Sequence, residues 1–188
     1  ISCVYHGWTY RLDTGELVAA LTDGPDSPIC GKAGVRVKTY PVEDRAGRLW
    51  VGTENGGLDY FDFTTRQFQH NKFDPNNPSG LNSNSVWALH RDPTGSLWVG
   101  TFAGGLNISR QNGNAIRKFR AVAGDASSLA YNSVMGFLED SRGTVWVATD
   151  GGGLDKFDRA TGKFVHYSAQ TSNLNSNAVL AITEGLLI

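Results

Sequence analysis

Short runs of apolar and β-branched residues, each closed by a turn signal, dominate the chain from about residue 42 onward. In residues 81–128 the runs cover 85–91, 97–102, 105–109 and 115–122, and Asp92, Pro93 and Gly95 lie in the first turn between them. Short strands separated by turns every 8–12 residues or so are typical of an antiparallel sheet, and no stretch shows helical periodicity. The pattern predicts an all-β protein with four short strands in about fifty residues.

The same pattern occurs three times. Residues 47–53, 95–101 and 143–149 are versions of one heptad, and its tryptophans recur every 48 residues. Two further features keep this spacing: a glycine pair followed by leucine, and an aspartate three residues before the heptad glycine. The residues concerned are Trp50, Trp98 and Trp146; Gly56–Gly57, Gly104–Gly105 and Gly152–Gly153; and Asp44, Asp92 and Asp140. A fixed period of this length indicates a repeat architecture.

About fifty residues that form one four-stranded sheet match the size of a β-propeller blade. Residues 42–185 are therefore predicted to form three consecutive four-stranded blades, with repeat units at about 47–94, 95–142 and 143–185, and residues 1–41 form a separate segment. Propellers usually have four to eight blades. We expect an incomplete ring, either a fragment of a larger one or a ring completed by other blades or by copies of this chain.

Composition narrows the range of partners. The 188 residues carry a net charge of −1 with 19% charged residues, which argues against nucleic acid or an anionic membrane as the main partner. No apolar run is long enough to span a membrane. The catalytic motifs G-x-S-x-G and HExxH, the P-loop and the dinucleotide fingerprint are all missing from the sequence. No catalytic residue is predicted.

The repeat suggests structural roles for most candidate catalytic residues. His70 and His166 occupy the same repeat position, where the middle copy has Lys118, so we expect a solvated outer face. His90, at the end of a strand, is interpreted in the same way. The aspartates before the heptad glycine are predicted to cap turns, because Asp bonds to backbone amides ahead of it.

Two other sets recur. Asp59, Asn107 and Asp155 follow the glycine pairs and are interpreted as turn or strand-edge residues. The repeat tryptophans are assigned to the core between blades, and a stacking platform for sugars is the alternative.

Residues 139–154, which run from Glu139 through the heptad to Leu154, resemble the two-component regulator propeller repeat: an acidic turn, G-x-L-W-[VI]-G-T and then G-G-L. Residues 81–86 resemble the L-x-x-N-x-[VI] element that precedes it. The resemblance implies a periplasmic or extracellular ligand-sensing ring, without catalytic activity, joined through a membrane segment to a signalling output. It also implies carbohydrate or another small molecule as the ligand.

The first segment resembles another family. Residues 3–10, with Cys3, His6, Gly7 and Trp8, are similar to the second cluster-binding loop of Rieske ring-hydroxylating oxygenases. The resemblance implies that residues 1–41 are a partial Rieske-like fold in which a β-hairpin follows this loop. Cys3 and His6 would then be ligands of a 2Fe–2S cluster, and the protein would be cytoplasmic. A Rieske cluster needs two cysteines and two histidines. The family's other ligand loop is expected upstream of Ile1, and Cys30 does not replace it. No cofactor is therefore expected unless that loop is supplied.

Residues 40–51 fit both families, at the point where the two segments join. A natural fusion and a chimeric or truncated sequence both explain such a join. Three functions follow: a ligand-sensing propeller of a two-component-type receptor, a Rieske-type electron-transfer component of an oxygenase, or a protein-interaction propeller. A chimeric gene fragment without function is the fourth alternative.

Overall fold

The computed structural model describes residues 9–10, 17–19, 48–110 and 116–185. Contacts between Cα atoms divide the chain into two units, Ile1–Pro41 and Val42–Ile188. In the first unit, β1 (Thr9–Tyr10) and β2 (Leu17–Ala19) form an antiparallel pair in which Thr9 lies opposite Ala19. This pair is the predicted N-terminal hairpin segment.

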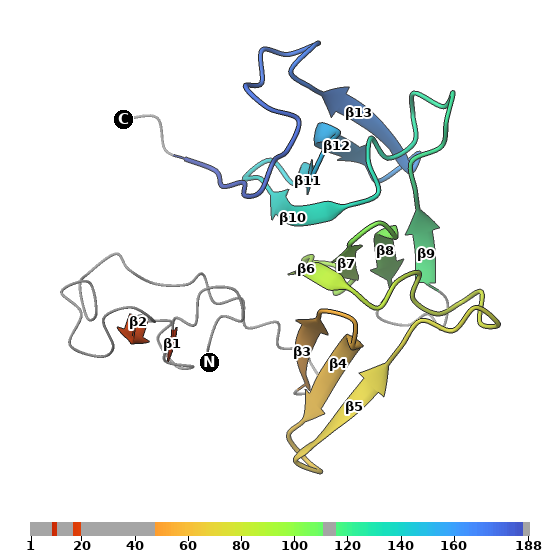
Figure 1. Ribbon diagram of the computed structural model, residues 1–188, viewed down its shortest axis with the longest axis vertical. Coiled ribbons are helices and arrows are strands. Elements are labelled where there is room, and N and C mark those ends of the chain that lie inside the picture. The colour runs from red at the N-terminus through yellow and green to blue at the C-terminus, as the bar shows by residue number, and fades with distance from the viewer. Residues whose placement is uncertain (1–8, 11–16, 20–47, 111–115, 186–188) are drawn as a thin grey trace. The chain divides into compact units, whose positions relative to one another are not determined.

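The second unit consists of three antiparallel sheets in which consecutive strands pair with each other (Figure 1). The described residues contain no helix. The first sheet is β3 (Arg48–Thr53), β4 (Gly57–Asp62) and β5 (Gln67–Asn71). The second is β6 (Val86–Arg91), β7 (Leu97–Thr101), β8 (Gly105–Ser109) and β9 (Ile116–Phe119). The third is β10 (Val134–Glu139), β11 (Val145–Thr149), β12 (Gly153–Asp158) and β13 (Lys163–Tyr167). The sequence prediction of all-β, blade-like sheets is confirmed.

Each complete sheet begins one strand before its tryptophan strand. Strand β6 pairs with β7, and β10 pairs with β11, each with a register shift near its start. The sheets are therefore offset by one strand from repeat units counted from the heptad glycine. The counterpart of β6 in the first sheet falls before Arg48, outside the described residues.

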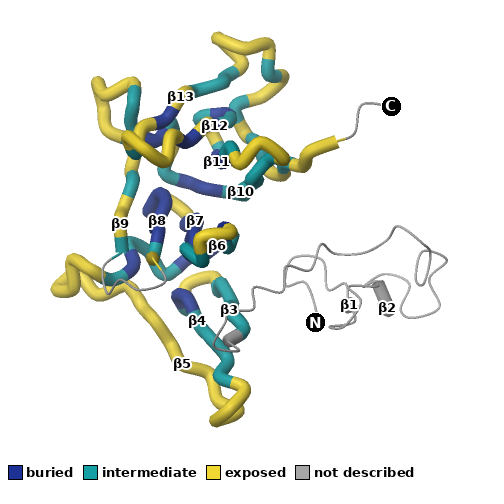
Figure 2. Tube along the Cα trace, turned by 180° about the vertical axis from the view of Figure 1, so that it is seen from behind, coloured by how far each residue is buried: buried dark blue, intermediate teal, exposed yellow. Residues whose placement is uncertain are grey.

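The core lies between neighbouring sheets, and the outermost strand β5 is exposed along its length (Figure 2). One buried cluster fills the space between the second and third sheets: Trp98, Leu106, Ile108, Leu129, Val134, Val145, Val147, Phe157 and Phe164. A smaller cluster between the first and second sheets contains Leu58, Leu81, Val86, Leu97 and Val99, with Trp50 packed against it. Apolar burial between sheets is the main stabilising term for such a stack.

A repeated asparagine is hydrogen-bonded to the sheet that precedes it in the sequence. The backbone carbonyl of Asn132 accepts a 2.7 Å hydrogen bond from the amide of Gly105, and its Oδ1 accepts one of 2.8 Å from the amide of Ala121. Asn84 and Asn177 make the same two kinds of bond, to Gly57 and Phe73 and to Gly153 and Ala169 respectively. This asparagine is the invariant residue of the L-x-x-N element, so the element fixes the junction between sheets.

Candidate functional site

The turn aspartates have the predicted capping role and one further role. Oδ1 of Asp92 accepts hydrogen bonds from the amides of Thr94 (3.0 Å) and Ser96 (2.9 Å). Its Oδ2 accepts a 2.9 Å bond from the indole nitrogen of Trp98. Asp140 repeats this arrangement in the third sheet with the amides of Arg142 and Thr144 and the indole of Trp146. Asp44 lies outside the described residues.

Asp92 is also the centre of a charged cluster between the second and third sheets. Its side chain is 1% exposed, and Nη1 of Arg159 lies 2.6 Å from its Oδ2. Burial acts to raise the pKa of Asp92. Hydrogen bonds from Thr94, Trp98 and Arg159 and from the Ser96 amide outweigh burial and lower this pKa to about 2. The carboxylate is therefore ionised whenever the protein is folded near neutral pH.

Arg159 links Asp92 to a second carboxylate. Its Nη2 lies 3.0 Å from Oε2 of Glu139, and its guanidinium lies 5.4 Å from the centre of the Trp98 ring. His90 approaches the same Glu139 oxygen at 3.6 Å. Burial lowers the pKa of His90, and the hydrogen bond and charge of Glu139 oppose this shift only in part. His90 thus has a structural role, as expected from the sequence, but it is half-buried between sheets rather than on a solvated outer face.

Two of the residues that follow the glycine pairs do not lie at the turn or strand edge that the sequence predicts. Asp155 and Asn107 are fully buried and lie inside strands β12 and β8, at neither a turn nor an exposed edge. The amide of Ala130 donates a 2.8 Å hydrogen bond to Asp155, and Nδ1 of His166 lies 2.7 Å from it. Burial raises the pKa of Asp155, and these two partners offset only part of that effect. The sequence prediction failed because the partners lie on other segments.

The repeated histidines pair with these buried positions. His70 contacts Asp59 at 3.0 Å and is 62% exposed, as predicted for an outer face, whereas His166 is only 27% exposed. In the second sheet the same cross-strand pair is Asn107 and Lys118. Asp therefore occurs with His, and Asn occurs with Lys. This pairing within the chain supports a structural role for the histidines.

Trp98 belongs to the core and Trp50 packs against it, as predicted, whereas Trp146 is in neither buried cluster of the described residues. Trp98 is 1% exposed and meets Phe157 edge to face at 5.2 Å. Trp50 and Trp146 are half-buried against Tyr60 and Tyr167. A ring buried like that of Trp98 offers no face to a sugar, which removes the stacking alternative at that residue.

A different set of aromatic side chains is accessible. The rings of Trp87 and Phe102 lie 4.6 Å apart at an interplanar angle of 33°, and Phe102 is 47% exposed. Phe102 lies in the loop before β8. Tyr131 is 46% exposed and covers Gly151 in the equivalent loop before β12. These residues mark one end of the sheets, which we call the aromatic end (Trp87, Phe102 and Tyr131). The repeat pattern does not predict the aromatic end, because its three residues do not recur in the other copies.

Cys3 and His6, the residues predicted as half of a cluster site, lie outside the described residues. Among the residues that the structure describes, no group of three or more His, Cys, Asp and Glu side chains is arranged to hold a metal ion. In the same part of the chain, no helix is long and apolar enough to cross a membrane.

Comparison with known families identifies the repeat. Residues 80–103 and 128–151 match the family described as two component regulator propeller. Each matched segment begins beside the L-x-x-N element and ends in the loop after the tryptophan strand. These two segments are similar to two-component regulator propeller repeats. The 48-residue period extends the repeat pattern to Trp50, outside the matched residues.

Solved propeller domains have the same fold. The extracellular domain of the hybrid two component system BT3049 from B. thetaiotaomicron is 26% identical with a TM-score of 0.68, over 75% of this chain. The extracellular domain of the one component system BT4673 from the same organism is 23% identical with a TM-score of 0.52, over 70% of this chain, and shows the fold alone. This chain covers 20% of each of these proteins.

Curated relatives support the second resemblance over a shorter stretch. The terminal oxygenase component CarAa of carbazole 1,9a-dioxygenase is 48% identical over 56 residues in the Sphingomonas protein and 39% identical over 56 residues in that of Metapseudomonas resinovorans. Each match spans 30% of this chain and only 14% of the relative. The likeness is therefore to a small part of an oxygenase.

Proposed function

We propose that this chain is part of a ligand-sensing propeller of a two-component-type receptor and that it binds carbohydrate at the aromatic end. The observation that carries this proposal is the accessible pair of rings formed by Trp87 and Phe102, 4.6 Å apart. The C–H face of a sugar ring is attracted to the negative face of an aromatic ring, and desolvation of both faces adds to binding. The likeness to the extracellular domain of BT3049 supports a sensor.

Comparison of the three repeat copies distinguishes residues that build the fold from residues that are free to bind a ligand. Residues that build every sheet, such as Asp92 and Asn132, recur at the same spacing. At the aromatic end the sheets differ: Phe102 corresponds to Glu54 and Asp150, and Trp87 corresponds to Met135. Tyr131 corresponds to Ser83. A fold that tolerates Glu, Asp, Met and Ser at these positions has no structural need for aromatic rings there, so we infer that the rings serve a ligand.

The experiment is a thermal-shift screen of neutral oligosaccharides with the full chain, followed by calorimetry of each hit. Trp87→Met and Tyr131→Ser introduce residues that other copies of the repeat have at these positions, so both variants should fold. We expect at least one oligosaccharide to bind, with affinity weakened about tenfold by Trp87→Met. Unchanged affinity in both variants would place the ligand elsewhere, and a screen without hits would contradict carbohydrate as the ligand class.

A second candidate function rests on the 48% identity to the oxygenase component. The residues present do not fit a Rieske cluster, because Cys3 and His6 supply one cysteine and one histidine where two of each are required. No electron-transfer step is therefore derived. Iron and sulfide reconstitution of the chain, followed by electron paramagnetic resonance, tests this directly. A Rieske signal that disappears in His6→Ala would establish the second candidate, and protein without bound iron would remove it.

A further inference from the structure

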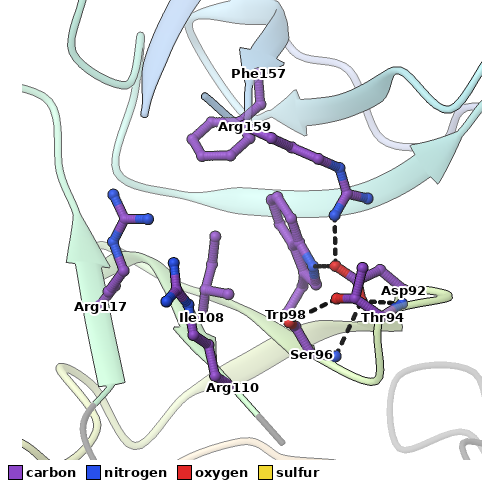
Figure 3. Close-up of a pocket in the computed structure, with 9 residues that line it drawn as sticks. All are labelled: Asp92, Thr94, Ser96, Trp98, Ile108, Arg110, Arg117, Phe157 and Arg159. Atoms are coloured by element: carbon purple, nitrogen blue, oxygen red, sulfur yellow. Dashed lines mark hydrogen bonds and ion pairs between the residues drawn. The ribbon is translucent and has the colours of Figure 1, made fainter. Parts of the chain in front are cut away.

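We propose that a groove between the second and third sheets, at the end opposite the aromatic end, binds an oxyanion group of the sulfate or phosphate type. The groove has a volume of about 410 Å³. Three arginines line it: Arg110 directly after β8, Arg117 in β9 and Arg159 directly after β12 (Figure 3). Ile108 and Phe157 supply its apolar wall.

The arginines differ in how their charge is balanced. Arg159 is held by Asp92 at 2.6 Å and by Glu139 at 3.0 Å. No ion pair joins Arg110 or Arg117 to any described residue. The guanidinium of Arg117 lies 5.0 Å from the centre of the Phe119 ring, which orients it without neutralising it. Of the described residues that line the groove, only Asp92 is a carboxylate, and it is already bound by Arg159. Among the described residues, therefore, no carboxylate balances the positive charges of Arg110 and Arg117.

The repeat shows that the fold does not require these cations. Arg110 takes the position of Asp62 in the first sheet and Asp158 in the third. Both aspartates accept hydrogen bonds from backbone amides of the turn that follows them, those of Thr64 and Ala160 among others. Arg117 takes the position of Gln69 and Val165. The second sheet thus replaces a structural carboxylate with a cation and places another cation on the neighbouring strand.

Guanidinium groups favour oxyanions for geometric reasons. Each presents N–H donors in a planar fork that fits two oxygens of a sulfate, phosphate or carboxylate, and the weak hydration of the fork lowers the cost of desolvation. The apolar wall beside the arginines strengthens such bonds by excluding water on one side. A groove of about 410 Å³ is larger than a free ion, so the oxyanion is expected on an organic carrier.

The experiment measures binding of inorganic phosphate and sulfate to the full chain by calorimetry, at constant ionic strength set with sodium chloride. Arg110→Asp and Arg117→Gln introduce the residues that the first sheet has at these positions. Far-ultraviolet circular dichroism checks that both variants fold. Arg142→Gln removes an exposed arginine from the turn after Asp140, outside the groove, and serves as the control. We expect saturable binding that each groove variant weakens at least tenfold and the control changes less than twofold.

Equal weakening in Arg142→Gln, or no binding of either ion by the native chain, would overturn the proposal. Glucose 6-phosphate and glucose 6-sulfate then distinguish the two oxyanions, since the ester that binds more tightly than its free ion identifies the oxyanion class. The site is independent of the aromatic end. Phe102→Glu should leave phosphate affinity unchanged. Loss of carbohydrate binding and loss of phosphate binding can therefore be told apart.

Discussion

The indole nitrogen of Trp98 donates a 2.9 Å hydrogen bond to Oδ2 of Asp92, the carboxylate that closes the turn before the tryptophan strand. Trp146 and Asp140 repeat this bond at the same length. Because Trp98 packs into the core between the second and third sheets, the turn and the core are positioned by the same carboxylate. This coupling gives a physical reason for the fixed spacing between aspartate and tryptophan in every copy.

Removal of that carboxylate should be costly. Asp92→Ala leaves the indole of Trp98 and the guanidinium of Arg159 without their shared acceptor at a site that is 1% exposed. We expect the free energy of unfolding to fall by about 3 kcal/mol. Urea unfolding measures it, with Asp125→Ala as the control, since Asp125 caps an exposed turn through Ser127. Equal losses in the two variants would contradict the shared role of Asp92.

The pH dependence of stability follows from the same group. The pKa of Asp92 is about 2 in the folded protein, against an ordinary value of 3.8. A lowered folded-state pKa contributes stability that is present above the unfolded value and is lost as the pH falls from about 3.8 towards 2. The contribution is on the order of 2 kcal/mol. Urea midpoints between pH 5 and pH 2 should fall less steeply in Asp92→Asn than in the native chain, and parallel curves would refute this assignment.

Close packing at Gly100 permits the second and third sheets to approach. A Cβ at this position would lie 2.6 Å from Cγ1 of Val134, and Val134 is fully buried. Gly100→Ala should destabilise the protein by about 1–3 kcal/mol, and Val134→Ala should restore part of that loss in the double variant. Gly136→Ala is the matched control, because its Cβ would meet Ala148 at an ordinary 3.9 Å. Thermal unfolding of the four variants measures the coupling.

The cross-strand pairs should be exchangeable between sheets. The double variant Asp155→Asn with His166→Lys imports the Asn107–Lys118 pair and is expected to keep the unfolding free energy within about 1 kcal/mol of the native value. Burial raises the folded-state pKa of Asp155, so its contribution to stability falls as the pH rises from 3.8 through that pKa. The double variant should lack this fall. A loss of several kcal/mol would show that the pair is specific to its sheet.

The repeat made much of the fold predictable. The 48-residue period predicted where the strands lie, that Asp92 caps a turn and that Trp98 is buried. These features depend on local chemistry that each copy shares. The buried position of Asp155 could not be predicted, since its amide partner Ala130 comes from a segment 25 residues away. The aromatic end and the arginine groove consist of residues that differ between copies. Departure from the repeat, at Phe102 and Arg110 for example, was the signal available in the sequence.

Fluorescence titration of the full chain with an oligosaccharide identified by the screen tests the central claim most directly, because Trp87 lies in contact with Phe102 and should report ligand at the aromatic end. Phe102→Glu introduces the residue that the first sheet has at this position. The control is Phe63→Arg, which introduces the residue that the third sheet has there. Phe63 is about as exposed as Phe102 and lies at the opposite end of the sheets. We predict a saturable change that Phe102→Glu weakens at least tenfold and Phe63→Arg leaves intact. Equal affinity in the native chain and Phe102→Glu would contradict a carbohydrate site at the aromatic end.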